Sequence, residues 1–371
     1  MSEKRKHRYF SDYLNEMAQT YLSWFMKEKK DENIVFSPIS IFMLLVIAAY
    51  ASAGRTRSEI GDYLRERGRA DEDHVLAHLA FLQHKLMDSG SFTSANAVCV
   101  QETIRASIVP DFEKLLKNYL GGSLFATRDI VRDVNAWVSE KTRGMITQLA
   151  DESMTRMLAC LMNAVSFESE WLEPYGEEDI SEGSFTNADR SAARVPMLSS
   201  TEHTYYEDEQ CIGFRKPYRD EQFSFWAWLP RQKGRAGLKK TVEGIDFSQL
   251  EELAVLERVI VTMPEFTYDF SEELTELCRQ LGIRTMFTPD ADFSPMTSES
   301  LMVDSIVHKA HIEVDRKGTR AAAATAAFMV KAAAVPREPK VVCLDRSFIY
   351  AVVNTETGLP AFVGVCSQLG E

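Results

Sequence analysis

The amino-acid sequence predicts a single domain of the α+β class. Helical patterns concentrate early in the chain and strand-like runs concentrate late. No linker rich in Gly, Ser or Pro, no low-complexity tract and no repeat divides the 371 residues. The composition, 45% hydrophobic and 26% charged, is that of a globular protein with a large core. We therefore expect one domain over residues 1–371.

The first expected elements are helices. Apolar residues at helical spacing, among them Tyr13, Tyr21 and Phe25, predict an amphipathic helix that ends near Lys30. After a short extended piece, the next helix is expected over residues 39–53, and because it is apolar on every side it should be buried on every side. Further helices are expected over residues 58–66, 72–87, 131–149 and 270–281.

Strand-like runs dominate from the middle of the chain onward. Buried or alternating apolar residues predict strands over residues 158–167, 223–229, 259–266, 303–314, 348–354 and 360–367. The last two should form a hairpin whose turn contains Gly358.

One segment fits neither class. Residues 319–334 contain nine alanines in sixteen positions, so intrinsic propensity favours a helix. The segment lacks a helical apolar stripe, however, and Pro336 and Pro339 follow it. Its small side chains can enter almost any packed environment. We interpret it as a candidate switch between loop and strand.

The charge and the cysteines exclude several classes of protein. A formal net charge of −13 argues against binding to nucleic acid or to an anionic membrane, because both require positive surface. The most apolar stretch, residues 34–53, is interrupted by Pro38, Ser40 and Ser52 and falls short of a membrane span. No signal-peptide core follows the N-terminus, and the six cysteines are scattered. These features predict a cytoplasmic protein with reduced thiols, and leaderless release is the alternative.

The sequence holds none of the common catalytic motifs. It lacks the nucleophile elbow, the zinc-protease helix motif, the phosphate-binding glycine loop and the C-x-x-C pair. His74 and His78 have a spacing that can bind a metal on a helix, but no third ligand accompanies them. We therefore expect no enzyme activity, no metal and no cofactor.

A few polar residues stand where apolar ones are expected. His308 and Asn163 lie in apolar strands, and Ser37 and Ser40 lie at the start of the apolar helix. Buried polar groups need hydrogen-bond partners. These four residues are therefore interpreted as a polar network inside the core.

A series of short motifs runs along almost the whole chain. In order, they are Asn33-Ile-Val-Phe-Ser-Pro-Ile-Ser-Ile41, Gly54, Thr56, Ile60, Asn135, Thr142, Gly144, Ile146, Asn163, Trp171, Phe185, Val195-Pro-Met197, Leu281-Gly-Ile283, Val307-His-Lys-Ala310, Gly318-Thr319 and Pro360-x-Phe-x-Gly364. Each motif is weak alone, but in this order the set is strongly specific. The sequence resembles the serpins, and its leaderless start is similar to the intracellular, ovalbumin-like (clade B-like) inhibitory branch.

The resemblance implies an architecture. It implies a serpin fold of three β-sheets and about nine helices, with an exposed reactive-centre loop at about residues 316–340. It also implies a polar "shutter" beneath the main sheet and a "breach" where that sheet opens. The shutter would consist of Ser37, Ser40, Asn163 and His308, and the breach of Trp171, Glu265 and Arg316.

The resemblance also implies a mechanism. A serine protease attacks the loop and forms an acyl-enzyme, and the cleaved loop then inserts into the main sheet and traps the enzyme. The expected hinge residues are small and comprise Gly318, Thr319, Ala321, Ala322, Ala323, Ala324 and Thr325. In the inserted strand the inward set would be Thr319, Ala321, Ala323, Thr325, Ala327, Met329 and Lys331.

The scissile bond follows from family spacing. Counting from Gly318 gives Ala332–Ala333, an elastase-type site, and a shift of one residue gives Lys331–Ala332, a trypsin-type site. The expected partner is thus an elastase-like or trypsin-like serine protease held in a covalent complex. The inhibitor itself is expected to be a monomer that can form loop–sheet polymers. The alternative is a non-inhibitory serpin that acts as a chaperone or binding module.

The sequence departs from the family pattern at the hinge. Arg316 and Arg320 stand where glutamate is usual. The usual partner of the first glutamate is a lysine on a neighbouring strand, and here the matching residue is Glu265. We expect the two signs to be exchanged, so that Glu265 pairs with Arg316.

Overall fold

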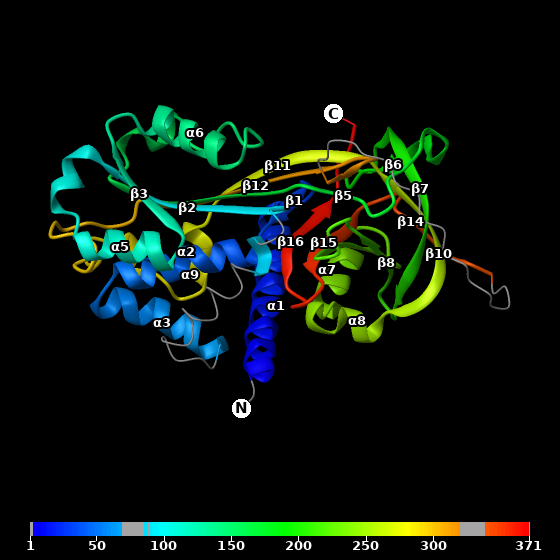
Figure 1. The fold of residues 1–371 in the computed structure, drawn as a ribbon, viewed down its shortest axis with the longest axis horizontal. Helices are drawn as coiled ribbons and strands as arrows, with labels where there is room; N and C mark the ends of the chain where they lie inside the picture. The colour runs from blue at the N-terminus through cyan, green and yellow to red at the C-terminus, as the bar shows by residue number, and fades with distance from the viewer. Residues whose placement is uncertain (1–2, 69–84, 88–89, 320–337, 371) are drawn as a thin grey trace. The chain divides into compact units, whose positions relative to one another are not determined.

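The structure is a computed structural model that describes residues 3–68, 85–87, 90–319 and 338–370 (Figure 1). The chain gathers into two compact units, each made of separate stretches of sequence. The first unit contains residues up to 13, 39–166 and 269–311, and the second contains residues 14–38, 167–268 and 312 onward. The expected helix over residues 72–87 lies almost wholly outside the described residues.

The first unit combines helices with one part of a sheet. Its elements are α2 (Pro38–Ala51), α3 (Gly54–Gly68), β2 (Phe92–Gln101), η1 (Glu102–Ser107), α5 (Pro110–Tyr119), β3 (Gly122–Thr127), α6 (Ile130–Lys141), η2 (Glu152–Arg156), β4 (Ala159–Phe167), α9 (Thr275–Gln280), η5 (Thr285–Phe287) and β12 (Ser305–Val314), of which α2, β4 and β12 share their end residues with the second unit. The strand order is β3-β2-β4-β12, and β4 and β12 run parallel. Helix α6 covers one face of these strands, and α2 and α5 lie on the other side (Figure 1).

Helix α6 ends earlier than the sequence suggested. Its first turn is capped by Asp129, whose Oδ1 accepts a hydrogen bond from the N–H of Arg132 at 3.1 Å. At the other end the Thr142 hydroxyl donates to the Val138 carbonyl at 2.7 Å, and Gly144 adopts φ 78°. Arg143, with φ 53°, is left-handed as well, and these two residues stop the helix. The expectation of one helix over residues 131–149 was therefore wrong in its second half.

The second unit is built around a nine-stranded sheet of order β1-β16-β15-β9-β8-β7-β10-β14, with β6 beside β7. The bounds are β1 (Ile34–Phe36), β6 (Ile180–Thr186), β7 (Ala192–Glu207), β8 (Cys211–Pro217), β9 (Phe223–Pro230), β10 (Val255–Pro264), β14 (Lys340–Cys343), β15 (Phe348–Asn354) and β16 (Pro360–Cys366). Smaller elements are β5 (Ser169–Glu170), η3 (Glu177–Asp179), α7 (Arg235–Gly244), η4 (Phe247–Gln249), α8 (Leu250–Leu253) and β13 (Gly318–Thr319).

Two further elements are divided between the units along the chain. Helix α1 (Glu3–Glu28) begins in the first unit and ends in the second, and β11 (Phe266–Glu273) begins in the second. The sequence placed a helix over residues 270–281, which is wrong in its first half because β11 continues to Glu273. Phe266, Phe270 and Leu274 are buried and lie four apart, a spacing that suits a helix face and a strand face equally.

The α+β class is confirmed. Hydrogen bonds join the described strands into two networks where three sheets were expected. The reason is the sixteen-residue strand β7, which pairs with β6 near its start, with β8 near its end and with β10 in between. The six cysteines are free thiols, and all but Cys343 are buried. Among the described helices, none is long and apolar enough to cross a bilayer.

Candidate functional site

A tight turn between β12 and β13 leads into the alanine-rich segment. The Oδ1 atom of Asp315 accepts hydrogen bonds from the N–H groups of Lys317 (2.7 Å) and Gly318 (2.9 Å). Strand β13 then lies antiparallel to β12, with Val314 opposite Thr319, and pairs on its other side with β5. The second unit therefore fixes the direction in which the chain enters the segment.

Glycine is required in this turn. A Cβ atom at Gly318 would lie 2.2 Å from the carbonyl oxygen of Ser169, which belongs to the backbone of β5. Backbone cannot move aside as a flexible side chain can, so any larger residue would separate β13 from β5. The sequence assigned Gly318 to the expected hinge, and the close approach of β5 is a separate physical reason for glycine at this position.

Trp171 holds the turn from the side of β5. Its ring nitrogen donates to the carbonyl of Asp315 and its backbone N–H donates to the carbonyl of Lys317, both at 2.9 Å. The ring is fully buried and stacks on Tyr218 at a centroid distance of 4.6 Å. The Tyr218 hydroxyl lies 2.6 Å from that of Thr319, which is itself fully buried. Tyr218 is a site residue that sequence reasoning missed.

Arg316 and Glu265 are in contact at the same turn. The Oε1 atom of Glu265 accepts from the backbone N–H of Arg316 at 3.1 Å and from its Nε at 3.3 Å. A second carboxylate, that of Glu177, lies 3.4 Å from Nη1 of Arg316. The Arg316 side chain is 39% exposed and that of Glu265 is 19% exposed. The exchange of signs at this position thus leaves an attractive pair.

A buried ion pair lies beneath the Trp171 ring. The Nζ atom of Lys216 is 2.8 Å from Oε1 of Glu202, and the lysine side chain is 2% exposed. The ammonium also faces the rings of Tyr175 at 4.5 Å and of Trp171 at 5.5 Å. Burial alone would lower the pKa of Lys216, but the Tyr175 hydroxyl and the Glu202 carboxylate outweigh it and raise that pKa.

Sequence reasoning missed this pair, although a signal was present. Lys216 lies two residues after Phe214 and two before Tyr218, and both aromatic residues are fully buried. Successive side chains of a strand point to opposite faces, so alternate positions share one face. A lysine between two inward aromatic residues on a strand was therefore a candidate for a buried charge.

In the first unit, Asn163 and His308 are joined by a hydrogen bond of 2.8 Å between Oδ1 and Nδ1. The amide nitrogen of Asn163 donates to Ser94 Oγ (3.0 Å) and to Asn96 Oδ1 (2.9 Å), so its oxygen accepts. His308 Nδ1 must then carry a proton. Burial lowers the pKa of His308 to about 3, which keeps the ring neutral.

The two serines assigned to the same network are both buried. Ser40 Oγ lies 3.0 Å from Ser94 Oγ, so Ser40 is linked to Asn163 through Ser94. Ser37 is fully buried directly before α2. Ser94 and Asn96 take part in the network but were not found in the sequence, since β2 was not predicted.

The rest of the predicted site lies outside the described residues. This applies to the hinge residues after Thr319 and to both versions of the scissile bond, namely Ala321, Ala322, Ala323, Ala324, Thr325, Lys331, Ala332 and Ala333. Within the described part of the chain, no group of His, Cys, Asp or Glu side chains is arranged to hold a metal ion.

Comparison with known proteins gives one consistent result. The family model described as "Serpin (serine protease inhibitor)" matches residues 12–369. Serpin-Z3 of Arabidopsis thaliana is 29% identical over 90% of this chain and 90% of its own, and Intracellular coagulation inhibitor 2 of Tachypleus tridentatus is 28% identical over 98% and 92%. The solved structure of the thermophilic serpin tengpin in its native state is 27% identical, with a TM-score of 0.85 over 100% of this chain and 95% of that one.

Proposed function

The chain belongs to the serpin family, and from this premise we propose that it inhibits serine proteases as a suicide substrate. A protease would cleave the loop and remain bound as an acyl-enzyme, and the freed end of the loop would then enter the sheet. Such insertion is a case of strand addition, in which backbone hydrogen bonds supply the driving force. The members of this family are mostly protease inhibitors rather than enzymes, and we propose that this chain has no catalytic activity of its own.

One observation carries the proposal, and it is the register of β13 on β12. Val314 lies opposite Thr319 in an antiparallel pair. If the loop continued in this register, Ala321 would fall opposite Ile312, Ala323 opposite Ala310 and Thr325 opposite His308.

The residues that would receive the loop suit this register. Ile312, Ala310 and His308 are all buried, whereas the alternate positions of β12 are partly exposed. The loop would therefore present only small, uncharged side chains to the core over the first steps of insertion, from Thr319 to Thr325. The charged Arg320 would lie on the other face, so entry requires no burial of a charge near the hinge.

Insertion would also improve the strand pairing. In the structure β12 pairs in parallel with β4, from Ser305 opposite Cys160 to His311 opposite Ser166. The inserted loop would separate these two strands and run antiparallel to each of them. One parallel interface would thus become two antiparallel ones, and antiparallel pairing is slightly more stable per residue.

The finer assignments follow from the same proposal. We propose Ala332–Ala333 as the scissile bond, which implies an elastase-like target, with Lys331–Ala332 and a trypsin-like target as the alternative. We further propose that the expected shutter residues hold the sheet closed from within, namely Ser37, Ser40, Asn163 and His308. In this scheme the inhibitor acts as a cytoplasmic monomer without a cofactor.

The test is incubation with elastase, trypsin and chymotrypsin, followed by denaturing gels. The proposal predicts a band at the summed mass of the inhibitor and of at least one of these enzymes. Mass spectrometry of the released C-terminal peptide identifies the cleaved bond. Clean cleavage by every enzyme without any complex would instead support a non-inhibitory chaperone or binding module.

A further inference from the structure

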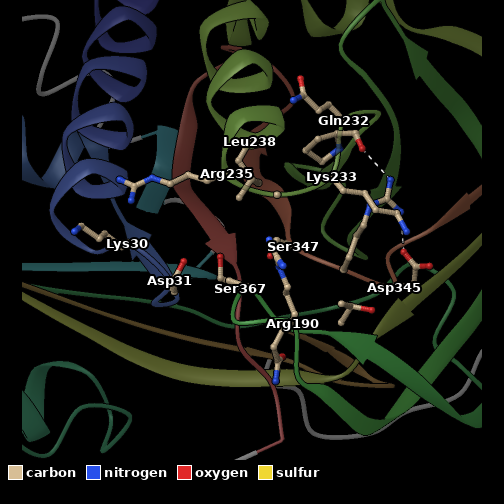
Figure 2. Close-up of a pocket in the computed structure, with 16 residues that line it drawn as sticks. Lys30, Asp31, Arg190, Gln232, Lys233, Arg235, Leu238, Asp345, Ser347 and Ser367 are labelled. Carbon is tan, nitrogen blue, oxygen red and sulfur yellow. Dashed lines mark hydrogen bonds and ion pairs between the residues drawn. The ribbon is translucent and has the colours of Figure 1, made fainter.

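A cavity of about 430 Å³ lies in the second unit, remote in sequence from the hinge (Figure 2). It is formed by the end of α1, the turn between β6 and β7, the first turn of α7, and the ends of β15 and β16. Its volume is within the range of small-molecule sites, about 300–1,000 Å³. The serpin mechanism proposed above does not use this cavity.

The walls of the cavity are positively charged, although the protein carries a net charge of −13. Five cationic side chains line it against the two carboxylates of Asp31 and Asp345. The cationic residues are Lys30, Arg190, Lys233, Arg235 and Arg346.

Two of these cations are already engaged by the protein. Arg346 lies 2.8 Å from Oδ1 of Asp345, which neutralises that carboxylate, and it also donates to the carbonyl of Pro230 at 2.9 Å. Arg235 donates to the carbonyls of Met26 and Lys27 at the end of α1. These contacts fix both arginines in the wall of the cavity.

The other three cations have no such partner. Among the described residues, none forms an ion pair with Lys30, Arg190 or Lys233, and all three are exposed. Arg190 adopts φ 74°, a backbone conformation that glycine or asparagine takes far more readily than arginine. This conformation places a guanidinium at the mouth of the cavity (Figure 2).

The floor of the cavity offers hydrogen-bond donors. Ser347 and Ser367 line it and are only 9% and 3% exposed. A serine hydroxyl on the wall of a cavity can donate a hydrogen bond to a bound ligand.

The first turn of α7 adds a favourable dipole. The helix is ten residues long, and its N-cap residue Gly234 provides no capping side chain. The first N–H groups of a helix lack partners within it, and together with the helix dipole they attract anions. Gly234 and Arg235 at this end both line the cavity.

From these observations we infer that the cavity binds a small organic molecule carrying several phosphate groups. One phosphate would lie at the start of α7 and accept hydrogen bonds from the hydroxyls of Ser347 and Ser367. The remaining phosphates would lie at the rim, against Lys30, Arg190 and Lys233. Arginine, lysine and a helix N-terminus together match phosphate in charge and geometry.

The test uses the intact protein and two probes, inositol hexakisphosphate and inorganic phosphate. Isothermal titration at 150 mM salt should show one site for inositol hexakisphosphate, bound at least tenfold more tightly than inorganic phosphate. Several phosphates can engage the rim and the floor together, whereas a single phosphate cannot. Equal affinity for the two probes, or no binding of either, would overturn the inference.

Two variants locate the site. Arg190→Gly removes the charge and relieves the backbone strain, so the fold is preserved, and Lys233→Ala removes a second rim charge. Each should weaken the binding of inositol hexakisphosphate about tenfold, as the loss of one charge-assisted hydrogen bond does. The matched control is Lys117→Ala on α5, an exposed lysine of the first unit. Equal weakening by all three substitutions would mean non-specific attraction and would refute the site.

Discussion

The hydroxyl group of Thr319 lies 2.6 Å from that of Tyr218, whose ring stacks on Trp171. Burial raises the pKa of Tyr218 far above its ordinary value, so the phenol stays protonated and the two hydroxyls remain hydrogen-bonded at any physiological pH. The first inward residue of the proposed insertion is thus already seated in the sheet before any protease arrives.

We predict that Thr319→Arg converts the inhibitor into a substrate. A buried guanidinium without a partner costs several kcal/mol, and this cost would fall at the start of insertion, which must outrun deacylation. The variant should still be cleaved at the same bond, but no complex should form on denaturing gels. Lys317→Arg places the same side chain at an exposed position and should leave trapping intact. Full trapping by Thr319→Arg would contradict the assigned register.

The contact between Arg316 and Glu265 predicts that reversing the charge of Arg316 promotes polymerisation. Arg316→Glu places a carboxylate beside those of Glu265 and Glu177, so it should loosen the hinge and promote loop–sheet polymers on mild heating. The pair is partly exposed and contributes only about 0–1 kcal/mol, so the effect should appear in the rate of polymerisation rather than in the free energy of unfolding.

Adding Glu265→Lys to Arg316→Glu should restore the monomer, because it recreates an attractive pair. Size-exclusion chromatography after heating measures all four members of this double-mutant cycle. Additive effects of the two substitutions would show that the pair has no role in keeping the sheet closed.

The buried pair of Lys216 and Glu202 predicts a large and asymmetric effect on stability. Lys216→Met leaves the Glu202 carboxylate buried without its partner and should lower the free energy of unfolding by about 3–5 kcal/mol. The double variant Lys216→Met with Glu202→Leu should recover most of this loss, since apolar residues often replace a buried ion pair without cost. Urea unfolding measures the free energy of unfolding of both variants. Equal values for the single and double variants would contradict the view that the unpaired Glu202 carboxylate causes the loss.

The neutral His308 predicts a dependence of stability on pH. In the unfolded chain the imidazole takes up a proton below about pH 6.5, but in the folded chain it does so only near pH 3. The stability that His308 contributes is therefore fully present above pH 6.5 and is lost as the pH falls, at about 1.4 kcal/mol per pH unit.

His308→Gln should flatten this dependence, because glutamine can donate a hydrogen bond but does not titrate. Urea unfolding between pH 6.5 and 4 gives the free energy of unfolding of each protein. The titration of the carboxylates is the same in both and cancels when the two free energies are subtracted. Parallel curves for the two proteins would show that folding does not lower the pKa of His308.

The sequence was most informative where the burial of an element leaves a regular pattern of apolar residues. The all-apolar helix became α2, and the alternating run before the hinge became β12, because burial on every side or on one face leaves a clear pattern. The motif order identified the family, and the exchange of signs at Arg316 suggested Glu265 as its partner.

The sequence was least informative where the role of a residue depends on a partner far away along the chain. A single sequence shows only the pattern of near neighbours. Tyr218, Glu202 and Ser94 are polar groups whose roles depend on strands that pair only in the folded chain, and β2 and β8 were not predicted. A spacing of four, as between Phe266 and Phe270, fits both a helix and a strand, so β11 was predicted as part of a helix. Gly144 is itself a helix-stop signal, but the prediction ran past it because Ile146 continues the apolar spacing of α6.

The central claim is that the cleaved loop inserts between β4 and β12, and the melting temperature of the cleaved protein tests it most directly. Insertion would add roughly a dozen residues to the sheet, each backbone hydrogen bond contributing about 0.5–1.5 kcal/mol, for a sum on the order of 10 kcal/mol. A protein cleaved in the loop by a non-target protease should therefore melt far above the intact protein in circular dichroism. Equal melting temperatures for the cleaved and intact proteins would contradict insertion, and with it the proposed mechanism.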